Sequence, residues 1–179
     1  MKPKILYILH FPPPIHGAAM VGQYIRESTI INTAFKGRYI NLGTSRTVDE
    51  IGKGGFVKWW RYLLLLWQTA FNLLVFRPNL VYLTLTSKGV GFYKDALVAI
   101  IAKVLGANMV YHFHNKGVST RQGKWLDNLL YELVFKNADV ILLSEHLYSD
   151  IQKYIPTNRV HICPNGIPEI ISESQISNS

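Results

Sequence analysis

The chain has 179 residues, which is enough for one α/β domain with a proper core and short for two. Hydrophobic residues make up 49% and charged residues only 17%, which excludes a disordered chain and indicates a strongly apolar core or an apolar surface for a partner. The formal net charge of +8 favours an anionic partner, although a merely soluble basic surface would give the same balance.

Cysteine usage and the first residues indicate where the protein works. Cys163 is the single cysteine, so an internal disulfide and a cysteine-rich metal site are both excluded and a cytoplasmic location fits best. The basic first residues and the apolar run that follows superficially resemble a signal peptide. The run stops at Pro12 after about seven residues and lacks a small-residue cleavage site, so we expect a strand instead.

The first unit of the chain has the pattern strand, stiff loop, helix. An apolar run covers Lys4–His10, three consecutive prolines follow, and a helix is expected from Gly17 to about Ser28. The first amide groups of a helix are unpaired and carry partial positive charge. This loop is therefore the first candidate for binding a phosphate or a carboxylate at the carboxyl edge of a sheet.

A second strand is expected at Arg38–Leu42, and a polar, glycine-rich, mobile loop at Gly43–Gly55. Phe56–Phe76 follows as the most apolar segment, and we expect a long helix that packs on a sheet. Four polar residues interrupt it on one stripe, so it does not resemble a membrane-spanning helix. An alternative or additional role is contact with lipid headgroups through four residues near its start: Lys58, Trp59, Trp60 and Arg61.

The remaining segments alternate strand and helix. Further strands are expected at Asn79–Leu85, Met109–His114, Asp139–Leu143 and Val160–Cys163. The helices between them are expected at about Tyr93–Leu105, Lys124–Lys136 and Glu145–Tyr154. This order predicts a doubly wound, Rossmann-like parallel sheet with helices on both faces, over residues 1–167. Residues 168–179 are expected to form a polar linker or tail.

Ligands of open parallel sheets bind in the loops that follow the strands. Glycines with Lys88 and Lys116 nearby offer contacts for an anion there, but neither a dinucleotide-binding nor a P-loop motif is present. Histidines also gather at these strand ends: His10, His16, His112 and His114. No carboxylate or cysteine accompanies them at ligand spacing, which disfavours a metal. We expect His112 to be a satisfied sheet histidine and His114 the better functional candidate.

Five segments in the same order resemble those of family 4 glycosyltransferases. They are the strand and loop from Ile5 to Gly17, Arg77–Tyr82, Phe113–His114, Asn137–Ser144 and Ile162–Ile167. The resemblance implies the N-terminal half of a GT-B fold, in which two Rossmann-like domains form the active site between them. It also implies transfer of a sugar from a nucleotide-sugar donor to a hydroxyl, usually with retention and without a metal.

The resemblance assigns His114 to the position near the transferred sugar and Gly17 to the loop near the donor diphosphate. Other residues of the strand-end loops are candidates for contacts with the donor or acceptor: His16, Lys88, Asn115, Lys116, Ser144, Glu145, Asn165 and Gly166. The usual Gly-Gly pair of the family appears here as His16–Gly17. The second, donor-binding domain is absent, so we expect the domain alone to be inactive.

Two function classes stay open on the sequence. The first is the acceptor-side half of a glycosyltransferase for a lipid-linked or polysaccharide acceptor, bound peripherally at the inner membrane face. The second is a non-catalytic, Rossmann-like module that binds a phosphorylated ligand or a partner protein. A nucleic-acid partner is disfavoured because the basic residues are scattered and no recognition motif is present.

Overall fold

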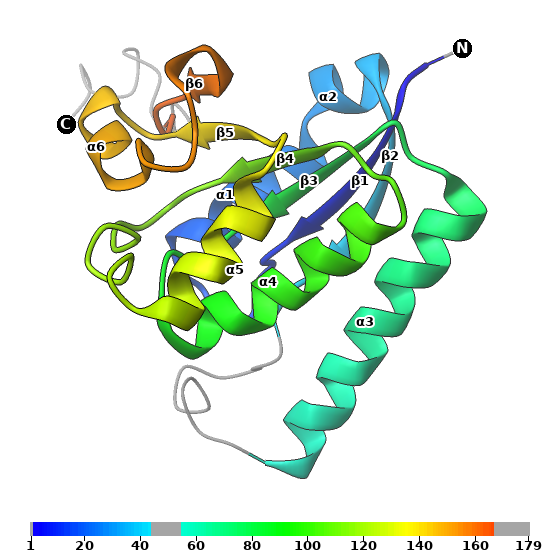
Figure 1. Ribbon diagram of the computed structural model, residues 1–179. Coiled ribbons are helices and arrows are strands. Elements are labelled where there is room, and N and C mark those ends of the chain that lie inside the picture. Colours follow the sequence, from blue (N-terminus) through cyan, green and yellow to red (C-terminus); the bar gives the residue numbers. More distant parts are fainter. Residues whose placement is uncertain (1, 44–54, 167–179) are drawn as a thin grey trace, which may run out of the picture.

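The computed structural model describes residues 2–43 and 55–166, whose strands form one six-stranded sheet (Figure 1). The strand order is β2-β1-β3-β4-β5-β6, and every neighbouring pair is parallel. The strands are β1 (Lys4–Leu9), β2 (Lys36–Asn41), β3 (Leu80–Thr84), β4 (Met109–His112), β5 (Asp139–Leu142) and β6 (Val160–Ile162). This confirms the expected Rossmann-like α/β fold.

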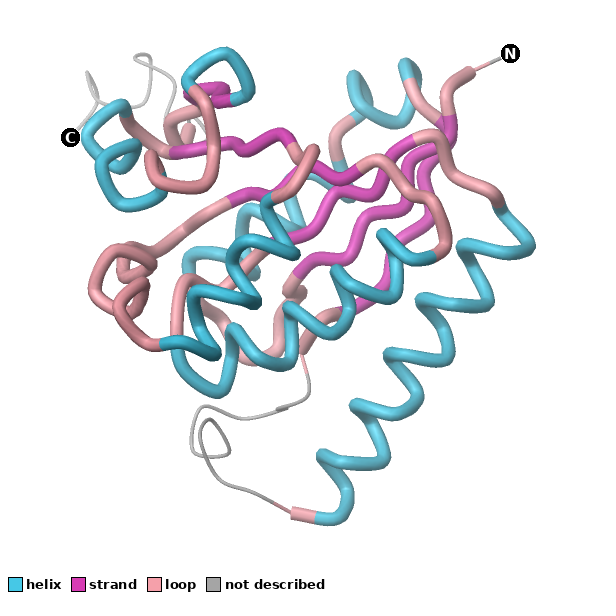
Figure 2. The backbone as a smooth tube through the Cα atoms, in the orientation of Figure 1, coloured by secondary structure: helices cyan, strands magenta, loops and turns pink. Residues whose placement is uncertain are grey.

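Helices cover both faces of the sheet (Figures 1 and 2). Three long helices lie on one face: α3 (Phe56–Phe76), α4 (Gly89–Val104) and α5 (Trp125–Phe135). The other face carries α1 (Gly17–Glu27) and α2 (Thr29–Ala34). Near β5 and β6 the chain forms shorter turns: η2 (Glu145–Leu147), α6 (Tyr148–Ile151) and η3 (Thr157–Arg159).

The apolar core is divided between the two faces of the sheet because side chains alternate along each strand. In β1, Leu6 and Ile8 belong to the larger cluster, which packs with α3, α4 and α5. Ile5 and Tyr7 belong to a smaller cluster that packs with residues of α1 and α2. Burial on both faces explains why the strands are nearly continuous apolar runs in the sequence.

The structure differs from the sequence-based elements at four places. Helix α4 begins at Gly89, four residues before the expected start at about Tyr93. The first helix ends before Ser28, because the Ser28 hydroxyl accepts a hydrogen bond from Ile31 N at 3.3 Å and starts the unexpected α2. The expected helix at Glu145–Tyr154 is a 3-10 turn followed by one helical turn, since Leu147 N donates to the carbonyl of Ser144. Strand β4 ends at His112, so His114 lies in the following loop. Most of the expected loop at 43–55 and the expected tail lie outside the described residues.

Helix α3 has the expected bounds but an unexpected orientation. It buries a stripe that contains Tyr62, Leu65, Thr69, Leu73 and Phe76. The expected polar stripe lies on its flank, where Asn72 accepts a hydrogen bond from Arg38 of β2 at 2.9 Å. Large apolar side chains therefore remain on the side of α3 that faces away from the core.

Gly22 sets how closely α1 approaches the end of β1. A Cβ atom at Gly22 would lie 2.1 Å from the carbonyl oxygen of His10. Neither atom can move without the backbone that carries it, so the clash can be removed only by moving α1 away from the end of β1. We expect Gly22→Ala to lower the free energy of unfolding by about 2–4 kcal/mol. Urea titration followed by circular dichroism measures this change.

Gly17→Ala is the matched control, because a Cβ there meets no atom within 4 Å. Its free energy of unfolding should stay within about 1 kcal/mol of the parent value. Equal stabilities for both variants would contradict the close packing of α1 on β1.

Candidate functional site

The strand order places the topological switch point of the sheet, where open parallel sheets have their crevice, at the carboxyl ends of β1 and β3. From β1 the chain passes through α1 and α2 on one face to β2, and then returns through α3 on the other face to β3. The loops after β1 and β3 therefore leave the sheet on opposite faces. In open parallel sheets this is the place where ligands bind.

Four histidines gather at this edge. His10 follows β1, His16 caps the start of α1, His112 ends β4, and His114 lies two residues beyond His112. The ring centroids of His10 and His16 are 5.3 Å apart, and those of His112 and His114 are 4.1 Å apart. The two pairs also interact electrostatically, since His16 lowers the pKa of His114. The structure thus brings together the imidazole rings of two segments, the loop after β1 and the end of β4 with its loop.

Two buried ring nitrogens in this cluster have no hydrogen-bond partner. Nδ1 of His112 is paired with the hydroxyl of Tyr82 at 2.7 Å, but Nε2 of His112 is buried and unpaired. Nε2 of His114 is also buried and unpaired. An unmet polar group costs about 1–3 kcal/mol, so these two atoms offer hydrogen bonds to an incoming polar ligand. His112 therefore has a hydrogen-bond partner at only one of its two ring nitrogens, whereas both were expected to be paired from the sequence.

Three histidines of this cluster, His10, His112 and His114, are held in their neutral form. Burial, with smaller effects of His16, Lys94 and His114, lowers the pKa of His10 to about 4. Burial and His114 lower the pKa of His112 to about 3, and burial and His16 lower that of His114 to about 4. At neutral pH these rings can accept as well as donate hydrogen bonds.

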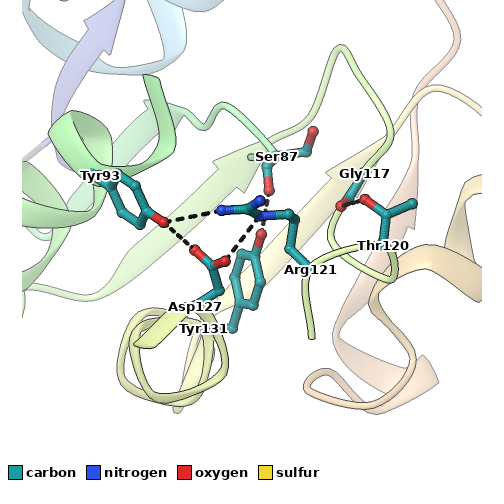
Figure 3. Close-up of polar contacts among 7 residues, drawn as sticks. All are labelled: Ser87, Tyr93, Gly117, Thr120, Arg121, Asp127 and Tyr131. Atoms are coloured by element: carbon teal, nitrogen blue, oxygen red, sulfur yellow. Dashed lines mark hydrogen bonds and ion pairs between the residues drawn. The ribbon is translucent and has the colours of Figure 1, made fainter. Parts of the chain in front are cut away.

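The loops after β3 and β4 are joined to each other. Ser87 N donates to the side-chain oxygen of Asn115 at 3.0 Å, and the Ser87 carbonyl accepts from the Tyr131 hydroxyl of α5 at 2.6 Å (Figure 3). The stem of Lys88 lies so close to Gly117 that a Cβ there would be 2.6 Å from Lys88 Cδ, and φ of +152° also favours glycine. Lys88 is thereby placed next to the histidine-bearing loop.

A buried carboxylate fixes the rest of the loop after β4. Asp150 of α6 accepts hydrogen bonds from the backbone N–H groups of Gly117, Val118 and Ser119 at 2.8, 2.9 and 3.0 Å. The Ser119 hydroxyl donates to the same carboxylate at 2.6 Å. Burial alone would raise the pKa of Asp150, but these hydrogen bonds together lower it. Asp150 therefore positions the loop as a charged acceptor.

A second carboxylate joins this loop to α4 and α5. The Tyr93 hydroxyl donates to Asp127 at 2.6 Å, and Arg121 forms an ion pair with Asp127 at 2.9 Å (Figure 3). Arg121 also donates to the Tyr93 hydroxyl at 3.3 Å. These contacts bind the end of the polar loop to both helices, so the candidate site is built on fixed elements.

The other candidate residues lie around this centre. Gly17 starts α1 with open space beside it, and Lys116 is exposed. Ser144 and the exposed Glu145 follow β5, next to β4. Asn165 and Gly166 are exposed and follow the edge strand β6.

The candidate membrane residues lie on α3, where Trp59 and Trp60 are exposed and Lys58 and Arg61 are half-buried. None of the described helices combines the length and the apolar character that crossing a membrane requires. Among the described residues, no three histidine, cysteine, aspartate or glutamate side chains form a group that could hold a metal ion.

Sequence reasoning missed Tyr82 and Asp150. Tyr82 is one of several aromatic residues in apolar strands, and its hydrogen bond to His112 depends on the pairing of β3 with β4. Asp150 lies 31 to 33 positions along the sequence from the three residues whose N–H groups donate hydrogen bonds to it.

Comparison with known proteins supports the fold. A solved structure titled "Crystal structure of UDP-N-acetylglucosamine 2-epimerase" matches with a TM-score of 0.55 and 9% sequence identity. The match covers 90% of this chain and 48% of the epimerase chain, so this chain spans about half the length of that protein. No protein-family model and no curated protein sequence matches.

The neutral histidines predict how stability depends on pH. An unfolded histidine takes up a proton near pH 6.5, whereas folded His114 does so only near pH 4. Stability should therefore fall as the pH falls through this window, by up to about 1.4 kcal/mol per pH unit for each proton. We expect His114→Gln to flatten the dependence, measured by urea unfolding at several pH values between 7 and 4.

His161→Gln is the control, since His161 is exposed on the edge strand β6. Asp95 has a pKa raised to about 6 by burial, so its ionisation acts in the opposite direction. Because Asp95 is present in every variant, its effect cancels in the comparison. The same slope for His114→Gln as for the parent protein would contradict the neutral state of this ring.

Loss of the Asp150 charge should loosen the loop after β4. Asp150→Asn places an amide NH₂ group against N–H donors, so we expect the free energy of unfolding at pH 7 to fall by about 2–4 kcal/mol. The stabilisation by ionised Asp150 exists above its unfolded pKa and is lost as the pH falls through the lower folded value. Asp139→Asn, at a half-buried position of β5, is the control for unfolding measurements. Equal losses for both variants would contradict the role of Asp150.

Proposed function

We propose that this chain is the N-terminal half of a retaining glycosyltransferase. It would contribute to transfer of a sugar from a nucleotide-sugar donor to a hydroxyl of a lipid-linked or polysaccharide acceptor. The observation that carries the proposal is the pair of buried, unpaired ring nitrogens of His112 and His114 at the crevice of a parallel sheet. The shared fold with a protein whose title names a UDP-sugar supports a nucleotide-sugar ligand.

The residues of the crevice are suited to different parts of such a donor. His114 offers a ring nitrogen for a sugar hydroxyl, as in the motif that it resembles. Helix α4 begins after Lys88 without a side-chain cap, so its first N–H groups are available to an anion. Lys88 adds positive charge at the same place, and His16 and Gly17 supply the start of α1 on the other side of the crevice.

The transfer would break the bond between the anomeric carbon and the diphosphate oxygen, and the electron pair would leave with the diphosphate. A bond from the anomeric carbon to the acceptor oxygen would form, and the acceptor proton would pass to the departing phosphate. The growing negative charge requires cations and amide dipoles around the phosphate. This half offers Lys88, Lys116 and the start of α4, and we assign the remaining contacts to a second domain.

A second candidate is a non-catalytic module that binds a phosphorylated ligand or a partner protein. It is favoured by one observation, namely that the unpaired ring nitrogens of His112 and His114 and the uncapped start of α4 all belong to this one domain. Nucleic acid has no part in either candidate.

Histidine ring signals in ¹H–¹⁵N NMR spectra test the ligand directly. Titration with UDP-N-acetylglucosamine, other nucleotide sugars and inorganic phosphate should shift the ring signals of His112 and His114, and should leave His161 unchanged. We expect His114→Ala to weaken binding about tenfold, because one hydrogen bond to a desolvated group is lost. His161→Ala is the matched control. Unchanged His112 and His114 signals at millimolar nucleotide sugar would contradict both candidates' use of this crevice.

A sugar-transfer assay separates the two candidates. The 179-residue chain should show no turnover with radiolabelled nucleotide sugars, while the endogenous polypeptide that contains it should transfer sugar to a lipid or glycan fraction. Loss of this transfer in the His114→Ala polypeptide, with His161→Ala active, supports the glycosyltransferase. Tight ligand binding without transfer by the endogenous polypeptide would favour the binding module.

A further inference from the structure

The side of α3 that faces away from the core is apolar along its length. We call it the outer α3 face, and its members are Trp59, Trp60, Leu63, Trp67, Phe71 and Leu74. Each is between 45% and 66% exposed. Trp67 and Phe71 stack on each other with ring centroids 5.2 Å apart instead of packing against the core. The opposite side of α3 is the one that is buried, so both sides of this helix are apolar.

Neighbouring helices also carry exposed apolar residues. Helices α4 and α5 lie on the same face of the sheet as α3 (Figure 1). Leu97 of α4 is 42% exposed and Leu129 of α5 is 39% exposed. An exposed apolar helix face such as that of α3 indicates a binding partner, because leaving it in water is unfavourable.

The charge of the segment decides which partner fits. Residues 55–94 contain five lysines and arginines and no aspartate or glutamate. A second copy of this chain carries the same net charge of +8, so like charges would repel it. An anionic surface instead attracts these charges. Lys58 lies on the same side of α3 as the buried Tyr62, at the start of the helix, and Arg61 lies on the flank that carries Asn72.

We propose that α3 lies in the surface of an anionic lipid membrane, with its axis parallel to the bilayer and its outer face between headgroups and acyl chains. Tryptophan suits this depth because its ring is apolar and its N–H is polar. The described helices do not cross a bilayer, which agrees with binding at the surface. The proposal does not depend on nucleotide-sugar binding.

This orientation would bring the candidate site close to the lipid. Helix α3 has 21 residues and is about 32 Å long, whereas the six-residue strand β1 spans about 20 Å. Its start, with Trp59 and Trp60, extends past the carboxyl edge of the sheet, where the four histidines lie (Figure 1). An acceptor held in the membrane would therefore be near the crevice.

Vesicle co-sedimentation of the 179-residue chain tests the proposal. We expect binding to phosphatidylcholine vesicles that contain phosphatidylglycerol, and weaker binding without phosphatidylglycerol or at high salt. A triple variant of the outer face, Trp60→Gln/Trp67→Gln/Leu74→Gln, should lower the partition coefficient by about tenfold or more. Ile30→Gln is the matched control, since Ile30 is 81% exposed on α2, at the opposite face of the sheet.

A spectroscopic measurement locates the contact. In a Trp125→Phe variant the remaining tryptophans are all in α3, so their emission should shift to shorter wavelength and be quenched by brominated lipids. Circular dichroism should show that the triple variant remains folded, because it changes exposed residues only. Absent vesicle binding, unquenched tryptophans, or equal binding by the triple variant would overturn the proposal. A dimer that the triple variant abolishes, without vesicle binding, would make the outer face a self-interface instead.

Discussion

The parallel pairing of β1 with both β2 and β3 is the constraint on which the rest of this structure depends. Tyr7 of β1 pairs with Tyr39 of β2 on one side and with Tyr82 of β3 on the other. The chain must therefore cross from one face of the sheet to the other between β2 and β3, and α3 makes this crossing. The same reversal separates the loops after β1 and β3, and His10 lies near His114 of the β4 loop at this edge.

Much of the fold could be predicted because both faces of the sheet are buried. Strands buried in this way are continuous apolar runs, and the runs at Lys4–Leu9 and Leu80–Thr84 are visible without any structural knowledge. The bounds of α3 were also correct, since Arg77 and Pro78 end an apolar segment. The fold class was therefore available from local patterns alone.

The details of the site were not available, because they depend on residues that are distant in the sequence. The gathering of histidines at strand ends was predictable, but the bond between Tyr82 and His112 requires knowledge of strand order. The orientation of α3 was similarly hidden. A helix that is apolar on both sides does not indicate which side meets the sheet, and the hydrogen bond between Arg38 and Asn72 helps to fix this orientation.

The neutral, buried histidines have a thermodynamic consequence for any anion that enters the crevice. Negative charge beside His10 and His114 favours their protonated forms, so such a ligand would take up protons from the solvent as it binds. Those protons come from the buffer, and each buffer releases them with its own enthalpy of ionisation. The heat measured by calorimetry would then differ between phosphate-like and amine buffers at one pH, and the difference would count the protons that accompany each ligand.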